Sequence, residues 1–211
     1  MIKKTINLVV AFSAFFALAS NANALILPMS GMSIFQMEHF ERVSEISLQQ
    51  LAKSNEKEKQ EHCLTLALYH EARGEPLAGQ YAVGATILNR VRSSVYPNTI
   101  CGVVYQNAHL KNRCQFSFAC DDRTDTPANS KSHKVMKRIS KLMLNGNLHE
   151  QMKFSANPAV EFVEDMTHYH RHDVYPVWSK KLARLAGIGN HVFFRSNRVT
   201  RRYVSLTTVK W

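Results

Sequence analysis

Several features common in proteins are missing from this chain, and each absence removes a class. After residue 24, no segment approaches 18 uninterrupted apolar residues, so no integral membrane helix is expected there. No two of the four cysteines have the C-x2-C spacing of a structural zinc site, which disfavours that class. Internal repeats and low-complexity tracts are also missing. The 211 residues are therefore expected to form one domain with a core, plus extensions.

Acidic residues are scarce relative to basic ones. The chain has 27 Lys and Arg but only 16 Asp and Glu, a formal net charge of +11. A strongly basic balance favours an anionic partner such as cell wall, outer-leaflet lipid or nucleic acid, and charge alone does not choose among them.

Charged residues are absent from Thr5 to Met37. Lys3 and Lys4 precede an apolar run that ends at Leu18, and residues 22–24 have the small-x-small pattern of a cleavage site. This pattern predicts a secretory signal peptide over 1–24 and export to the periplasm, cell envelope or exterior. Without the two signal lysines, 25 basic and 16 acidic residues remain, a charge of +9.

The four cysteines all follow the predicted signal peptide. An even number in an exported protein indicates two disulfides, for which three pairings exist. Cys114 and Cys120 can close a short loop, and Cys63 would then pair with Cys101. This pairing is the one that we predict.

Hydrophobic periodicity predicts a mostly helical α+β chain with a small antiparallel sheet. Residues 25–60 are expected to form a polar helix or linker, and 196–211 a basic tail. Residues 100–106 are compatible with a helix or a strand. Helices are predicted around residue 71 and over 78–93, 132–144 and 177–186, and short strands over 153–156, 167–170, 191–195 and 203–209.

Glu71 has an unusual position for an acid. It shares one helical face with Leu64 and Leu68, because Leu68 lies three residues and Leu64 seven residues before it. Gly74 and Pro76 then end the helix. Apolar neighbours and the negative helix end should both raise the pKa of this carboxyl. A carboxylic acid that is protonated near neutral pH can act as a general acid. The alternative is a surface acid paired with Arg73 or a lysine.

A series of short motifs follows Glu71 in a fixed order. They are Glu71-Ala72-Arg73-Gly74-Glu75-Pro76, Gly79-Gln80, Leu88-Asn89-Arg90-Val91, Pro97 to Gln106, Cys114-Gln115-Phe116-Ser117, Thr167-His168-Tyr169-His170, Trp178-Ser179 and Gly189 to Phe194. In this order the motifs resemble the SleB-type cell-wall hydrolase family, over roughly residues 61–195.

The resemblance implies a lysozyme-like catalytic domain over 61–195 that cleaves peptidoglycan between N-acetylmuramic acid and N-acetylglucosamine. In the family the reaction is lytic transglycosylation, and the catalytic acid matches Glu71. One carboxyl suffices because the nucleophile is the C6 hydroxyl of the substrate. The resemblance implies no metal and no cofactor. Glycan strands are the expected partner rather than nucleic acid, and the protein is expected to be a monomer.

Further residues receive predicted roles. Gln115, Phe116 and Ser117 are candidates for the cleft wall, since amide, hydroxyl and aromatic groups bind sugars. For Phe116, packing in the core is an equal alternative. Tyr169 and His170 match cleft residues of the family, and could orient the sugar or bind Glu71. Glu75, Gln80 and Asn89 are predicted to support the site structurally: Glu75 at the helix junction, Gln80 and Asn89 by bracing the first helix.

Three alternatives stay open. His168, His170 and His172 alternate along a predicted strand and could bind zinc, which would indicate a zinc-dependent cell-wall amidase or peptidase. A non-catalytic wall-binding protein is the second. Ordinary hydrolysis is the third, and it would need a second carboxylate. Candidates for that group are Glu75, Asp121, Asp122 and Asp165.

Overall fold

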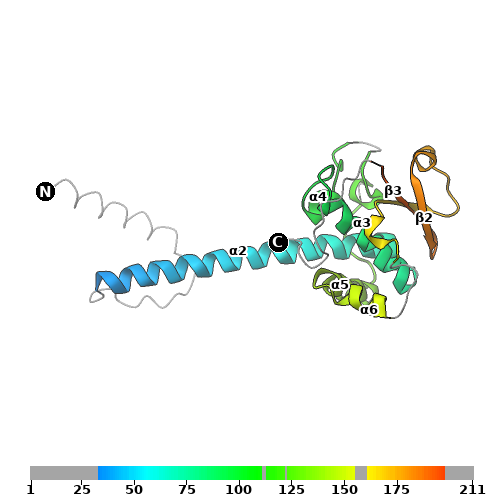
Figure 1. Ribbon diagram of the computed structural model, residues 1–211. Coiled ribbons are helices and arrows are strands. Elements are labelled where there is room, and N and C mark those ends of the chain that lie inside the picture. Colours follow the sequence, from blue (N-terminus) through cyan, green and yellow to red (C-terminus); the bar gives the residue numbers. More distant parts are fainter. Residues whose placement is uncertain (1–32, 111–112, 122, 155–160, 198–211) are drawn as a thin grey trace. The chain divides into compact units, whose positions relative to one another are not determined.

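A computed structural model describes residues 33–110, 113–121, 123–154 and 161–197 (Figure 1). The predicted signal peptide over 1–24, residues 25–32, the predicted strand over 203–209 and residues 198–211 of the predicted basic tail lie outside the described residues. The chain divides into two units, residues 1–48 and 49–211, and each is described by itself. The described elements are α2 (Ile34–Ala72), α3 (Leu77–Arg92), α4 (Ile100–Val104), η1 (Ser117–Cys120), α5 (Ser130–Leu144), α6 (Asn147–Phe154), η3 (Val163–Asp165), β1 (His168–Arg171), η4 (Val177–Lys181), β2 (Ala183–Ile188) and β3 (His191–Arg195).

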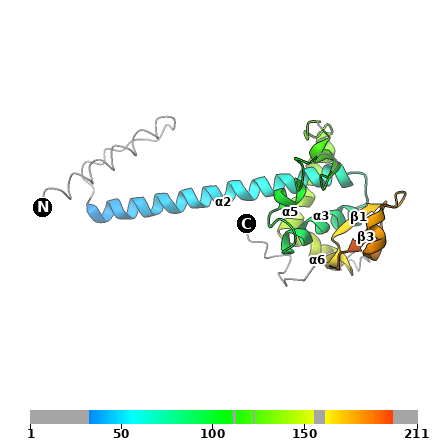
Figure 2. The same ribbon diagram turned by 90° about the horizontal axis from the view of Figure 1, so that it is seen from above.

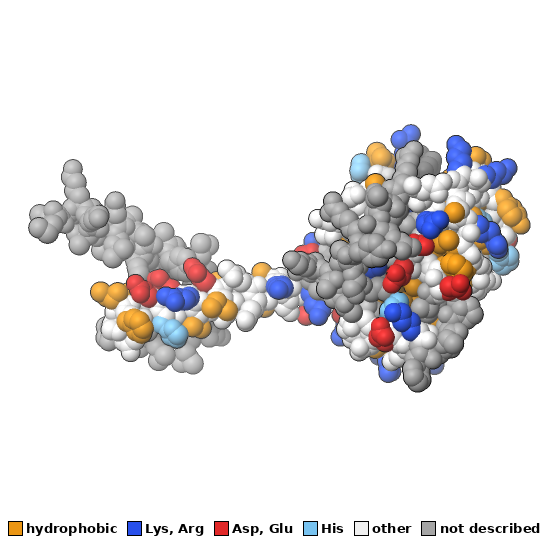
Figure 3. All heavy atoms as spheres, in the orientation of Figure 1, with side chains coloured by type: hydrophobic (Ala, Val, Ile, Leu, Met, Phe, Trp, Pro, Cys, Tyr) orange, Lys and Arg blue, Asp and Glu red, His pale blue; other side chains and the backbone are white. Residues whose placement is uncertain are grey.

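Helix α2 has 39 residues, and from Ile34 onward it adopts the helical one of the two alternatives predicted for residues 25–60. It begins with a capping box, in which Ser33 Oγ accepts from the amide of Gln36 and the Gln36 side chain accepts from the amide of Ser33, at 3.3 and 2.9 Å. It ends at Ala72, before Gly74 and Pro76, as predicted. Hydrophobic side chains of its N-terminal part are visible at the surface in Figure 3.

The core of unit 49–211 is built around α3. Nearly the whole helix is buried, from Gly79 to Val91, and it contacts α4, α5, η3 and β2. A Cβ atom at Gly84 would lie 2.5 Å from the Met143 sulfur on α5, so this close approach needs the small residue. Gly84 thus lets α3 and α5 pack closely.

The sheet has three antiparallel strands in the order β1-β3-β2. It lies at one edge of unit 49–211, with α3 between it and α5 in both views (Figures 1 and 2). Tyr169 is opposite Phe193 in the β1–β3 ladder, and β2 has an irregularity between Arg184 and Ala186. The mostly helical α+β class with a small antiparallel sheet is confirmed.

Two local predictions are wrong. The predicted helix over 177–186 is a short 3-10 helix, η4, followed by strand β2, because pairing with β3 outweighs the helical pattern of that segment. The predicted strand over 153–156 is also wrong at its start, since Lys153 lies in α6, while residues 155–156 are outside the described range.

The undecided segment after residue 99 forms the short helix α4. Cys101 on α4 is bonded to Cys63 on α2, with a Cα–Cα distance of 5.2 Å, and the second disulfide joins Cys114 and Cys120. The first bond therefore fixes α4 against the helix that carries Glu71. Among the described residues, no helix is long and apolar enough to cross a membrane.

Candidate active site

Glu71 lies in the last turn of α2, on the border between the core and the surface. Its neighbours on the helix, Leu68 and Ala72, are fully buried, whereas the Glu71 side chain stays partly exposed. Burial raises the pKa of its carboxyl above the ordinary value, while a hydrogen bond from Tyr169 and the charge of His70 act in the opposite direction. The site therefore favours the protonated acid and leaves it accessible.

The one hydrogen bond described for the Glu71 carboxyl comes from β1. The Tyr169 hydroxyl donates to Glu71 Oε2 at 3.2 Å, across 98 residues of sequence. Burial raises the pKa of Tyr169 well above its ordinary value, so the hydroxyl keeps its proton and remains a donor. The Tyr169 ring packs against His191 and Phe193 on β3, with centroid distances of 5.0 and 5.7 Å.

Helix α3 holds the segment that leads into β1. Asn89 donates to the carbonyl oxygens of Val163 and Met166 at 2.7 and 2.8 Å, and the Arg90 Nε donates to the carbonyl oxygen of Thr167 at 2.7 Å. Asn89 was predicted to brace α2. It supports the chain before β1 instead. These three hydrogen bonds hold the chain just before β1, and so they fix the position of Tyr169 on that strand.

Glu75 joins the helix junction to the turn between β2 and β3. Its two carboxylate oxygens accept from the backbone and side-chain nitrogens of Asn190, at 2.8 and 3.0 Å, and one lies 3.8 Å from His191 Nδ1. Gly189 has a φ of +57°, and a Cβ there would lie 2.0 Å from Glu75 Oε2. Gln80 donates to the Glu75 carbonyl oxygen at 2.8 Å and so braces the same junction.

The Glu75 contacts lead back to Tyr169. The Glu75 carboxylate lies beside His191, and the His191 ring packs edge-on against the Tyr169 ring. The Tyr169 hydroxyl in turn donates a hydrogen bond to Glu71. The two glutamates of the motif are thus connected through β3 and β1.

The three predicted cleft residues over 115–117 differ in their exposure to solvent. Phe116 is only 3% exposed and packs near Phe118, so its ring lacks the open face that stacking on a sugar needs, and it belongs to the core. Gln115 is partly exposed, and Ser117 is exposed at the start of η1. Among the described contacts, none joins these three residues to Glu71.

His170 does not face Glu71. Because successive strand residues point to opposite faces, it lies on the other side of β1 from Tyr169. There its ring packs near Phe194 and Trp178, at 5.0 and 5.6 Å, and its Nδ1 lies 2.8 Å from the Arg171 carbonyl oxygen. Among the described contacts, none joins His170 to Glu71, so a role of His170 in orienting the sugar stays a prediction.

The alternating histidines do not converge. His168 packs near Trp178, and burial lowers its pKa to about 4, whereas His172 Nδ1 lies 3.2 Å from the Asn190 carbonyl oxygen. In the part of the chain that the structure describes, no three His, Cys, Asp or Glu side chains are placed to hold a metal ion.

Sequence reasoning gave no role to Arg90 or His191. Arg90 is 2% exposed and its guanidinium lies over the Tyr96 ring at 5.3 Å, while His191 is 6% exposed between Tyr169 and Glu75. Arg90 lies in the Leu88 to Val91 motif and His191 in the Gly189 to Phe194 motif. A charged or titratable side chain within an otherwise apolar predicted element was the feature of the sequence that could have indicated their importance.

Comparison with known proteins gives three findings. A family model described as Cell Wall Hydrolase matches residues 74–194, starting three residues after Glu71. The spore cortex-lytic enzyme of Bacillus cereus is 58% identical over 40 residues, and that of Bacillus subtilis is 51% identical over 43 residues. These matches cover 19% and 20% of this chain, but only 15% and 14% of the relatives.

Two solved structures are also similar. The catalytic domain of the Bacillus cereus SleB protein is 26% identical with a TM-score of 0.42, covering 65% of this chain and 91% of that one. The catalytic domain of a germination-specific lytic transglycosylase, SleB from Bacillus anthracis, is 27% identical with a TM-score of 0.43, covering 64% and 93%.

Proposed function

This chain belongs to the Cell Wall Hydrolase family, and we propose that it is an exported enzyme that degrades peptidoglycan. In this proposal the enzyme cleaves the glycosidic bond between N-acetylmuramic acid and N-acetylglucosamine, and Glu71 is the general acid. The observation that carries the proposal is the Glu71 carboxyl itself: partly buried, with a raised pKa, and held by the Tyr169 hydroxyl at 3.2 Å.

The proposed reaction uses Glu71 twice. First the protonated carboxyl gives its proton to the glycosidic oxygen as the bond to the anomeric carbon breaks, through an oxocarbenium-like state. The carboxylate that results then takes the proton from the C6 hydroxyl of the muramic sugar. The C6 oxygen bonds to the anomeric carbon, which gives a 1,6-anhydro end and regenerates the acid. No water is consumed and no second protein carboxylate is needed.

Tyr169 suits both halves of this cycle. Its hydroxyl donates to one carboxyl oxygen, Oε2, which leaves Oε1 as the oxygen that exchanges the proton with substrate. The same bond stabilises the carboxylate formed after the first step, because a hydrogen bond to the charged form favours it. Burial and the Tyr169 bond thus act on opposite forms of the carboxyl, as an acid that also serves as a base requires.

The described candidates for a second carboxylate have other partners. Both oxygens of Glu75 accept from Asn190, Asp165 lies 3.4 Å from Arg195 Nη1, and Asp121 accepts from the amide of Arg123 at 3.0 Å. Asp122 lies outside the described residues. These contacts support the mechanism that needs a single carboxyl.

Product analysis tests the proposal. Purified sacculi digested by the wild type should release muropeptides with anhydro-muramic ends, each one water lighter by mass spectrometry than the reducing product. Reducing ends alone would indicate hydrolysis and a second carboxylate. Digestion should continue in EDTA, and its loss there would favour the zinc-dependent amidase or peptidase.

A further inference from the structure

Helix α5 carries a row of positive charges that the proposed chemistry does not use. Between Ser130 and Leu144 there is no acidic residue, and five basic side chains are all exposed. They are Lys131, Lys134, Lys137, Arg138 and Lys141, whose spacings of three and four residues place them on one face. The opposite face, with Met136 and Met143, is buried in the core, so the row has a fixed direction.

The row is unfavourable for the helix by itself. Like charges three or four residues apart repel, and Lys131 lies in the first turn, where the helix dipole disfavours a cation. Within the described residues, the one ion pair that α5 makes joins Lys141 to Glu61, at 3.9 Å. The row therefore offers an anionic partner four further cations whose charge is not already matched by an ion pair.

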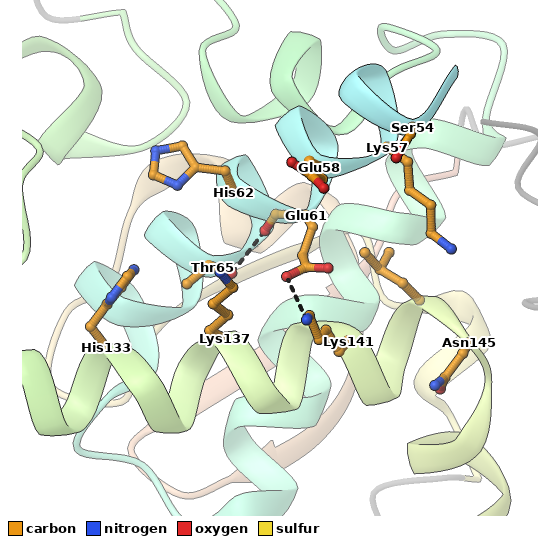
Figure 4. Close-up of a pocket in the computed structure, with 11 residues that line it drawn as sticks. Ser54, Lys57, Glu58, Glu61, His62, Thr65, His133, Lys137, Lys141 and Asn145 are labelled. Atoms are coloured by element: carbon orange, nitrogen blue, oxygen red, sulfur yellow. Dashed lines mark hydrogen bonds and ion pairs between the residues drawn. The ribbon is translucent and has the colours of Figure 1, made fainter. Parts of the chain in front are cut away.

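A hollow lies beside the row, between α5 and residues 54–65 of α2. Its volume is about 640 Å³, within the range of sites for small molecules and short peptides. Figure 4 shows Lys137 extending from α5 toward Thr65 and Lys141 toward Glu61, both on α2, and Lys57 also lines the hollow from α2. Glu71 does not line it, so the hollow is separate from the candidate active site.

The charges of the hollow have both signs. Lys57, Lys137 and Lys141 contribute cations, and Glu58 and Glu61 contribute anions. Two carboxylates would repel a polyphosphate or a nucleic acid at close range. A bilayer is disfavoured as well, because the exposed apolar side chain described on α5 is Val135 alone, which offers little to insert. A ligand with several carboxylates and an amine fits this combination.

We propose that the α2–α5 hollow and the basic row of α5 bind the stem peptides of peptidoglycan. These short peptides carry carboxylates and, where they contain a diamino acid, a free amine. In this assignment the row and Lys57 pair with the carboxylates, and Glu58 or Glu61 pairs with the amine. The inference rests on the proposed function for the identity of the polymer. It adds a second contact that holds the enzyme on the wall without touching the scissile bond.

Binding to sacculi tests the proposal without cleavage. The full chain with Glu71→Gln is sedimented with purified sacculi, alone and with Lys134, Lys137 and Lys141 all changed to Gln. The neutralised variant should bind about tenfold more weakly, since each exposed charge pair contributes modestly. A matched control changes the exposed Lys153, Lys180 and Lys181 to Gln, which removes the same net charge and should change affinity less than about twofold.

Two further arms identify the ligand. Sacculi whose stem peptides have been removed by an amidase should bind the neutralised and control variants equally, and the triple Lys→Arg variant should retain binding to intact sacculi. The proposal is overturned if the neutralised variant binds intact sacculi like the control, if the difference persists on peptide-free glycan, or if DNA competes as well as stem peptide at equal charge.

Cleavage is measured separately from binding. Wild type and the neutralised variant are compared on peptide-free glycan strands, where equal rates are expected. Failure of the wild type to cleave would contradict the proposed function alone, because the sedimentation result does not depend on cleavage. Normal cleavage together with unchanged binding would contradict only the stem-peptide site.

Discussion

The two parts of α2 have the same secondary structure and opposite surroundings. From Ile34 to Lys59 every side chain is exposed except Met37, which is partly buried. From Cys63 to Tyr69 every side chain is buried, and Glu71 follows two residues later. Local hydrogen bonds and capping suffice to describe the first part, whereas the second part is held by the core and by the bond between Cys63 and Cys101.

This difference explains where a catalytic side chain can be placed. A proton donor must keep its position to within a fraction of an ångström, and only packing and hydrogen bonds from other elements supply that precision. Glu71 has both, because α2 is buried from Cys63 to Tyr69 and the Tyr169 hydroxyl donates a hydrogen bond to Glu71 from β1. An acid of the exposed part, such as Glu45, is not buried, and no described contact from another element holds it.

The sharpest way to break the comparison is to remove the acid from each part. Glu71→Gln keeps the shape but removes the proton, and should lower the rate of glycan cleavage by about 10³-fold, the range for general acid catalysis. Unfolding free energy should change by less than about 0.5 kcal/mol. Glu45→Gln, on the exposed part of the same helix, should leave the rate unchanged. Release of soluble muropeptides measures both, and an active Glu71→Gln protein would end the mechanism.

Core truncation tests whether burial separates the two parts energetically. Leu68→Ala leaves a cavity in a fully buried site and should cost about 2–5 kcal/mol of unfolding free energy. Leu51→Ala removes the same atoms from a site that is 59% exposed and should cost less than about 0.5 kcal/mol. Urea unfolding curves give both values. Equal costs would mean that the core does not distinguish the two parts.

Removal of the Glu75 charge sharpens the account of how the sheet is held. Glu75→Gln weakens the charged hydrogen bonds to Asn190 and should cost about 1–3 kcal/mol. The rate should fall less than with Glu71→Gln, since Tyr169 is displaced rather than the acid removed. Thermal unfolding and cleavage measured on one preparation would separate these roles. A loss of rate as large as that of Glu71→Gln, with stability unchanged, would instead place Glu75 among the reacting groups.

The smallest effect is expected from Tyr169→Phe. The hydrogen bond from Tyr169 lowers the pKa of Glu71, so its loss should raise that pKa further. The protonated form is the active acid, and activity is lost as pH rises through the pKa. The alkaline limb of kcat/KM should therefore shift to higher pH, with a rate change of less than about tenfold at its maximum. A shift to lower pH would contradict the assigned direction.

Sequence patterns located α3, α5 and the end of α2 with Glu71 on it, because these depend on local spacing. Gly74 and Pro76 indicate the end of α2, and the predicted strands over 167–170 and 191–195 match β1 and β3 to within one residue. Val177 to Ala186 misled because its helical spacing is outweighed by pairing with β3, a contact that no local window contains. The sequence left Phe116 open between cleft and core for a related reason: a motif places an aromatic ring near a site but does not say which way the ring points.

The network behind Tyr169 lay beyond sequence reasoning. Arg90, Asn89 and His191 act through carbonyl oxygens or rings that are distant in the chain, such as the Thr167 oxygen 77 residues from Arg90. Asn89 was expected to brace its neighbouring helix, and holds the chain before β1 instead. Such partners depend on the arrangement of elements rather than on the motif that contains the residue.

Titration of one carboxyl tests the central claim most directly. Protein labelled with ¹³C at glutamate carboxyls is followed by NMR from acid to neutral pH, and the resonance missing from Glu71→Gln identifies the group. The account predicts that this resonance titrates above the ordinary glutamate range, since burial outweighs the Tyr169 bond. A midpoint at or below that range would contradict it, because Glu71 would then be ionised when substrate arrives.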